Sequence, residues 1–319
     1  MLVYSQYALI AALAVTVLAS IAYIWAVVRG HQASTVVTST TRAKVLVGSS
    51  GDHLDDLDSL AEVEDAAPAA RAPRGPAAAT LARNGSVLAW VALGLLTASL
   101  VLRTIVTGHG PFVTQHEFAT STAWGFLVMY LFFEWRYHAR TLALLVLPIT
   151  AAAELYALSQ AATADPLVPA LQNSLLLTTH IIVAIIAYGA FAVSFAAAVL
   201  YLAATSWPER FGHLLPKPDV LDRLGYRAVV IGYPLLTMVI VLGAVWAEIA
   251  WGSYWSWDPK ETASMVTWLI YGGYLHARVA RGWVGRGAAW LLVIAFASVV
   301  LTFVGNAFFG GLHGYGVNR

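Results

Sequence analysis

One tryptophan-rich stretch and a few histidines carry the residue types that can bind a flat ligand or a metal ion. The stretch reads W-G-S-Y-W-S-W-D over residues 251–258 and separates two long apolar runs. Its aromatic spacings of three, one and two residues suit neither one helix face nor one strand face. A loop could present such rings from several directions around a flat, apolar ligand. Anchoring at a membrane interface, where Trp and Tyr also gather, is the competing interpretation. The rings belong to Trp251, Tyr254, Trp255 and Trp257.

Asp258 ends this stretch and is followed by Pro259, with Glu261 three positions on. This order is typical of a helix N-cap, a proline at the first helical position and a capping-box acid. A helix is therefore predicted to begin at Pro259. Capping does not exclude contact with a ligand, so Asp258 also counts among the candidate ligand-binding residues. Lys260 could meet acidic groups of a ligand or reach the membrane interface as a snorkelling cation.

The composition indicates that these residues belong to an all-α, polytopic membrane protein. Hydrophobic residues make up 59% of the 319 positions and charged residues 11%, whereas soluble domains carry about a quarter of charged residues. The formal charge of +1, with the basic residues at segment ends, indicates no nucleic-acid partner. There is no cysteine, so any thiol chemistry must come from a partner protein.

Eight stretches are apolar enough to be predicted as membrane spans, since about 20 apolar residues cross the ~30 Å hydrocarbon core. Basic residues cluster after the first, third, fifth and seventh stretches, and the positive-inside rule assigns those connections to the cytoplasm. Both termini and the 251–258 loop are then predicted to be extracytoplasmic, in a protein of the cytoplasmic membrane. The predicted spans cover residues 5–28, 86–107, 118–136, 141–158, 173–205, 228–248, 262–279 and 288–308.

The chain is predicted to consist of a first transmembrane helix over 1–28, a linker over 29–85 and a seven-helix domain over 86–319. The linker combines an acidic run with the sequence A-A-P-A-A-R-A-P-R-G-P. Such a segment buries too little apolar surface to offset its ordering entropy. It is therefore predicted to be cytoplasmic and largely disordered.

Three histidines are the candidates for binding. His180 lies about seven residues into its span, roughly 10 Å from the outer end, and His313 follows the last span on the same side. His276 lies roughly 26 Å along the helix that begins at Pro259, in the inner half of the membrane, where an ionisable residue suggests a functional site. His109 and His116 fall in an external loop, where solvated surface histidines are expected.

Two imidazoles and an indole-lined shelf on one side of the membrane fit haem, whose iron takes axial histidines and whose macrocycle packs against rings. Zinc fits poorly, because the sequence has no close spacing of His, Asp and Glu ligands.

The run W-G-S-Y-W-S-W-D-P-K-E-T-A-S-M-V-T-W-L-I-Y resembles the WWD signature of haem-handling proteins. Together with the later Y-L-H-A-R and G-L-H-G-Y, it is similar to the CcsA (ResC) family of system II cytochrome c biogenesis, over roughly residues 86–319. The resemblance implies that His180 and His313 are axial ligands of an external haem b and that His276 belongs to a membrane haem site. It implies a holocytochrome c synthase that attaches haem through thioethers to the C-x-x-C-H motif of an apocytochrome c.

The same resemblance implies partners. The family's membrane haem site uses a second histidine from a ResB (CcsB)-like subunit, and no predicted span here supplies one. Thiol-reducing proteins would act upstream on the apocytochrome. In the loop after the second span, family members often read N-x-Y-E where this chain has T-Q-H-E, so the resemblance assigns no role to His116 or Glu117.

Two other functions remain open from the sequence. The chain could export haem or act as its chaperone without joining it to a protein. It could also be a structural subunit of a respiratory complex, in which the aromatic residues only anchor helices at the interface.

Overall fold

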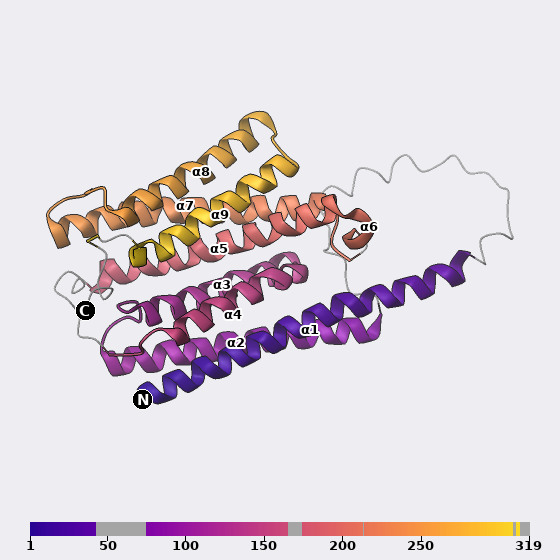
Figure 1. Cartoon of the computed structure of the whole chain (residues 1–319), viewed down its shortest axis with the longest axis horizontal. Helices are drawn as coiled ribbons and strands as arrows, with labels where there is room; N and C mark the ends of the chain where they lie inside the picture. The colour runs from indigo at the N-terminus through magenta and orange to yellow at the C-terminus, as the bar shows by residue number, and fades with distance from the viewer. Residues whose placement is uncertain (43–74, 165–173, 213, 309–310, 313–319) are drawn as a thin grey trace.

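The computed structural model describes residues 1–42, 75–164, 174–212, 214–308 and 311–312, and within these ranges the chain is helical with no strand. The elements form one elongated bundle in which α5 lies between the α1–α2 pair and the α7–α8–α9 group (Figure 1). They are α1 (Leu2–Arg42), α2 (Pro76–Thr107), α3 (Gln115–Tyr137), the 3-10 turn Arg140–Leu142, α4 (Ala143–Ser159), α5 (Ser174–Ser206), α6 (Pro208–Phe211), α7 (Pro218–Trp251), α8 (Pro259–Arg281) and α9 (Arg286–Phe308).

Each of the eight predicted spans coincides with a helix, which confirms the all-α membrane architecture. Six helical stretches in the described residues are long and apolar enough to cross a membrane: 2–29, 76–107, 140–159, 175–206, 218–251 and 286–303. Helices α3 and α8 lie over the other two predicted spans but are not among these six. Both carry more polar residues, and α3 is largely buried by its neighbours.

The helices extend into both ends of the predicted linker. Helix α1 continues to Arg42, and α2 begins at Pro76, where a proline at the first helical position has its φ already set for the helix. The predicted disorder between these helices concerns residues 43–74, which lie outside the described residues.

Helix α5 is the central element and packs on α3, α7 and α9. Its contact with α3 is close, because Gly125 and Gly189 face each other's helices without a side chain. A Cβ atom on Gly125 would lie 2.7 Å from the backbone oxygen of Ile185. On the far side of α5, the rings of Phe191 and Tyr271 stack with centroids 3.8 Å apart and so join α5 to α8.

One carboxylate inside the bundle, that of Glu134, is matched by several hydrogen bonds. Glu134 of α3 accepts hydrogen bonds from the hydroxyls of Tyr23 at 2.7 Å and Tyr130 at 2.6 Å, and from Arg140 Nε at 3.1 Å. Buried carboxylates need such donors, because desolvation otherwise makes the charged form costly.

The N-terminus, the α2–α3 connection and the α7–α8 connection all lie at one end of the bundle (Figure 1). The α8–α9 turn and the short helix α6 lie at the other end (Figure 1). The tryptophan-rich loop and the loop after the second helix therefore lie at the same end of the bundle, although about 140 residues separate them in the chain.

Candidate functional site

A cavity of about 150 Å³ opens at the loop end of the bundle, between α3, α5, α7 and the start of α8. Its walls are mainly aromatic and aliphatic, and a few polar side chains reach into it, as in most small-molecule sites. The α2–α3 loop contributes Phe112, Val113, Thr114 and Gln115, the tryptophan-rich loop contributes Tyr254 and Trp255, and the helices contribute Phe118, Leu177, His180, Ile181, Ala184, Tyr188, Val239, Ile240, Gly243, Ala244, Trp246, Lys260, Glu261, Ser264 and Phe303.

His180 lines this cavity from α5, in the second turn of the helix. Its Nδ1 donates a hydrogen bond to the backbone oxygen of Val239 at 3.0 Å, since a carbonyl can only accept. The ring sits against Gly243 of α7, where a Cβ atom would lie 2.9 Å from its Cε1 atom. The hydrogen bond leaves Nε2 as the basic nitrogen, which is the arrangement that metal-binding histidines use.

The four rings of the tryptophan-rich loop have different surroundings. Tyr254 and Trp255 line the cavity. Trp251 instead packs edge-on against Trp246, with ring centroids 4.7 Å apart. Trp257 points outward, 67% exposed, and its backbone has a φ of 59°, which is uncommon for a residue other than glycine. Two of the four candidate rings therefore form the cavity wall.

Asp258 is the N-cap of α8, which confirms the helix start predicted from the sequence. Its side chain accepts a hydrogen bond from the backbone N–H of Lys260 at 2.9 Å. The carboxylate of Glu261 in turn accepts from the N–H of Asp258 at 3.2 Å and from that of Ser256 at 2.8 Å. The loop therefore enters the helix in a fixed conformation, with Lys260 held at the cavity.

Lys260 is the cation of the cavity lining. Its Nζ lies 4.9 Å from the centroid of the Phe118 ring, and no carboxylate of the described residues forms an ion pair with it. Burial lowers the pKa of Lys260 to about 8, against the opposing effect of the negative charge on Asp258. A cavity that holds such an ammonium group attracts an anionic ligand.

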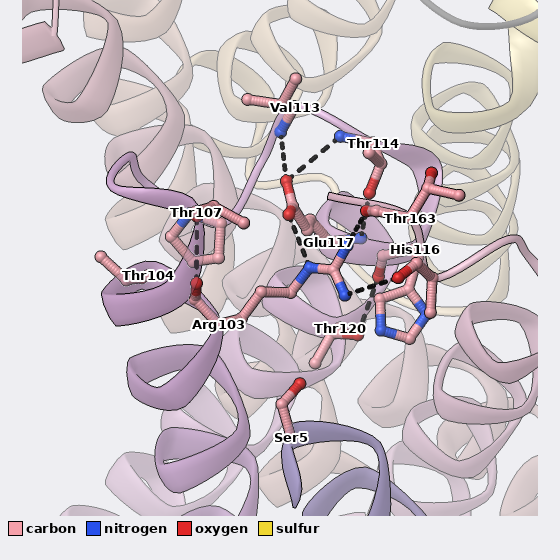
Figure 2. Close-up of polar contacts among 12 residues, drawn as sticks. Ser5, Arg103, Thr104, Thr107, Val113, Thr114, His116, Glu117, Thr120 and Thr163 are labelled. Atoms are coloured by element: carbon pink, nitrogen blue, oxygen red, sulfur yellow. Dashed lines mark hydrogen bonds and ion pairs between the residues drawn. The ribbon is translucent and has the colours of Figure 1, made fainter. Parts of the chain in front are cut away.

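A buried ion pair supports the cavity wall formed by the α2–α3 loop. Arg103 of α2 and Glu117 of α3 meet with Nε and Oε1 2.6 Å apart, and their side chains are 2% and 0% exposed. Figure 2 shows the guanidinium between Glu117 and the segment after α4. There it donates to the backbone oxygens of Ala162, at 3.4 Å, and Thr163.

The other oxygen of Glu117 binds the loop itself. Its Oε2 accepts hydrogen bonds from the backbone N–H groups of Val113 at 2.8 Å and Thr114 at 3.2 Å, and the Thr114 hydroxyl accepts from the N–H of Glu117 (Figure 2). This capping box begins α3. We call Arg103, Glu117 and Thr114 the outer clamp. It joins α2, α3 and the segment after α4 directly behind cavity residues 112–115.

The expectation of solvated loop histidines is wrong for His116. Its ring is 1% exposed, and Nδ1 donates to the backbone oxygen of Ala157 at 2.8 Å. The reason is that α3 begins at Gln115, so His116 belongs to a buried helix turn rather than to the loop. His109 is partly buried, with Nδ1 2.9 Å from the Gly110 oxygen.

Of the remaining two candidate histidines, His276 does not line the cavity. His276 is exposed on α8, on the same face as Gly273, beside which a side chain would meet no atom within 4 Å. Gly272, by contrast, is packed against the hydroxyl of Tyr233. His313 lies outside the described residues, the last of which is Leu312. No group of three metal-binding side chains occurs in the described parts of the chain, so His180 could supply one axial position rather than a complete metal site.

Several cavity residues escaped the sequence-based prediction. Phe112, Phe118, Tyr188, Trp246 and Phe303 supply most of the aromatic wall. Tyr188, Trp246 and Phe303 stand in apolar stretches, where nothing in the sequence distinguishes a cavity-facing ring from a lipid-facing one. The residues of the outer clamp could have been found from the sequence. Thr114 and Glu117 have the spacing of a capping box, and Arg103 is a cation at the end of an apolar run.

Comparison with known proteins gives consistent relatives. The family described as "Cytochrome C assembly protein" matches residues 113–313. A cytochrome c biogenesis protein CcsA from Guillardia theta is 34% identical over 251 residues, which cover 70% of this chain and 83% of that protein. The CcsA protein of Gloeobacter violaceus is 33% identical and covers 71% of this chain and 84% of its own length.

A solved structure of a haem lyase is among those with a similar fold. The cytochrome c haem lyase CcmF superposes with a TM-score of 0.60 at 17% identity. The match covers 95% of this chain but 46% of the CcmF chain, so this chain spans less than half of that longer protein.

Proposed function

The chain belongs to the cytochrome c assembly family, as a CcsA-type protein of system II cytochrome c biogenesis, and from that premise we propose that it presents haem b for covalent attachment to an apocytochrome c. The single observation that supports this most directly is the convergence of His180, Trp255 and Lys260 on one cavity. An imidazole for the iron, rings for the macrocycle and a cation for an acidic edge are what haem requires.

In this proposal His180 binds the iron through Nε2, and His313 is the second axial ligand. The hydrogen bond from Nδ1 to the Val239 oxygen would hold the imidazole in place and raise the basicity of the ligating nitrogen. Tyr254 and Trp255 would cover one edge of the macrocycle. Trp251 would act through Trp246, and Trp257 would face the incoming apocytochrome from the surface.

Lys260 would pair with a haem propionate. An ammonium group without a carboxylate partner in a half-buried site is stabilised by an anion from the ligand. Pairing would direct the propionate edge towards the start of α8. The vinyl groups, on the opposite side of the porphyrin, would then be accessible to the thiols of a C-x-x-C-H motif.

We predict that this pairing makes haem retention depend on pH. The pKa of Lys260 is lowered to about 8, and only the protonated form binds a propionate, so retention should fall as the pH rises through about 8 and above. A bound carboxylate raises this pKa, which places the midpoint at or above that value. The loss should be about tenfold in affinity, the size of one charge-assisted hydrogen bond.

The measurement is the Soret absorbance that remains after washing the purified complex at a series of pH values. Lys260→Arg keeps its charge throughout, so the absorbance that it retains should not change with pH. Lys260→Gln should retain little absorbance at every pH. A parallel decline in the wild type and Lys260→Arg would contradict the pairing.

His276 would bind haem inside the membrane together with a partner. It lies on an exposed face of α8 with Val266, Leu269 and Gly273, spaced as one helix stripe. A polar ring on an otherwise apolar, exposed face is costly in lipid and calls for a polar or metal partner. A ResB-like subunit that supplies a second histidine would satisfy it, and haem would pass from there to the outer cavity on the extracytoplasmic side.

The attachment itself would need no oxidant. Each cysteine S–H adds across one vinyl C=C bond, so that sulfur bonds to one vinyl carbon and the proton goes to the other. The cysteines must arrive reduced, and this chain contains none that could reduce them, so thiol-reducing proteins would act first. The contribution of the cavity would be to hold the vinyl groups and the thiols in register.

Co-expression of this chain with its ResB-like partner and an apocytochrome c tests the proposal, in cells that lack other maturation systems. We expect a cytochrome whose haem stays attached in a denaturing gel. Haem-loaded complex with no covalent product would instead favour the exporter. Complex purified in mild detergent without any Soret band would favour a structural subunit.

A further inference from the structure

The carboxylate of Asp258 makes a second contact that capping does not explain. Asp258 is 5% exposed and lies where the tryptophan-rich loop becomes α8. One oxygen, Oδ1, accepts the capping hydrogen bond from the N–H of Lys260. The other, Oδ2, accepts a hydrogen bond from the backbone N–H of Leu312 at 2.7 Å, across 54 residues of chain.

The chain passes directly against this carboxylate just before Leu312. A methyl group on Gly311 would overlap Asp258 Oδ2 and would lie 3.0 Å from Pro259 Cδ. A residue with a side chain therefore cannot replace Gly311 without moving one of the two segments.

Little else in the described residues holds this point of the chain. The side chain of Leu312 is 44% exposed, so apolar burial contributes only part of the attachment. A hydrogen bond to a buried carboxylate is stronger than one between neutral groups and selects one position for the donor. The Asp258–Leu312 contact therefore sets where the segment after α9 meets the tryptophan-rich loop.

We propose that Asp258 is a positioning residue: its Oδ2 holds the Gly311–Leu312 peptide against the start of α8, one residue before His313 in the sequence. Asp258 then serves the ligand through His313 rather than by touching it. The consequence for binding rests on the function proposed above, whereas the contact itself does not depend on haem.

Two substitutions test the contact, one at the acceptor residue Asp258 and one at Gly311, next to the donor. Asp258→Ser keeps a hydroxyl that can cap α8, but its single oxygen cannot also reach Leu312. Gly311→Ala leaves Asp258 and the cap in place and puts a methyl group on the oxygen. Gly94→Ala is the matched control, because a Cβ there meets no atom within 4 Å.

The first measurement is amide hydrogen exchange at residues 311–312, in the full chain with its partner and without added haem. Loss of one charge-assisted hydrogen bond should make exchange about tenfold faster or more in Asp258→Ser and Gly311→Ala. Gly94→Ala should exchange as the wild type does. Unchanged exchange in both variants would overturn the proposal, whatever the fate of haem.

The second measurement is the absorption spectrum of the haem-loaded complex, with His313→Ala in the same series. Asp258→Ser and Gly311→Ala should each lose part of the absorption signal of bis-imidazole haem and recover it with added imidazole. We expect the same response from His313→Ala. Faster exchange with a wild-type spectrum would overturn the positioning role. A wild-type spectrum in His313→Ala itself would instead refute the axial ligand of the proposed function.

Discussion

Replacing His180 with alanine is expected to reduce the haem held at the outer cavity at least tenfold and to abolish covalent cytochrome c. The imidazole of His180 is the one histidine side chain in the described cavity lining, and histidine is a common axial ligand of haem iron. Changes to the hydrogen-bond partners of metal ligands already cost about 10–100-fold in affinity, so loss of the ligand itself should cost no less. Millimolar imidazole should restore part of the signal, because it can enter the space left beside Gly243 and occupy the axial position.

The measurement is the Soret spectrum of the purified complex together with the yield of covalent haem in the co-expression assay. His138→Asn is the control, since His138 is exposed and has a φ of 52°, a conformation that asparagine tolerates. The ligand assignment fails if His180→Ala retains the wild-type spectrum and yield. It also fails if added imidazole changes the Soret spectrum of the wild type and of the variant to the same extent.

Removing the carboxylate of the outer clamp is expected to have the largest effect on stability. Glu117→Ala would leave the guanidinium of Arg103 buried without its counter-charge and would unpair the N–H groups of Val113 and Thr114. Breaking a buried ion pair in this way costs about 3–5 kcal/mol. That corresponds to a fall in Tm on the order of 10 °C in a chain of this size.

Thermal unfolding in one detergent, at one scan rate, measures the effect. Arg140→Ala is the matched control: it also removes an ion pair, with Glu134, but Arg140 is 44% exposed and Glu134 keeps its tyrosine donors. An ion pair whose cation is open to solvent contributes less than a fully buried one, about 0–1 kcal/mol when both partners are exposed. Equal melting temperatures for Glu117→Ala and Arg140→Ala would show that the clamp does not support the outer end of the bundle.

Features encoded by neighbouring residues could be predicted from the sequence. The order Asp258, Pro259 and Glu261 predicted the start of α8 because capping depends on residues within one turn. The helices were predictable because long apolar stretches in lipid must satisfy their own backbone hydrogen bonds. The same local logic applied to Thr114 and Glu117 would have shown that His116 belongs to a helix.

Features that depend on how helices are rotated could not be predicted. The depth of His276 along α8 follows from the rise per residue, but the exposed direction of its ring depends on which face packs against α7 and α9. Trp246 faces the cavity from the apolar stretch 228–247 of α7, so hydropathy does not distinguish it. The Arg103–Glu117 pair and the Asp258–Leu312 contact join segments whose approach is set by the whole bundle.

The close crossing of α3 and α5 has a consequence for biosynthesis. Helix α3 is not among the six stretches apolar enough to cross a membrane by composition, and Gly125 brings its backbone against Ile185 of α5. When α3 leaves the ribosome, α5 has not yet been made, so α3 lacks the neighbour against which Gly125 packs. We expect α3 to wait near the translocon or the lipid headgroups and to enter the bilayer only as a pair with α5.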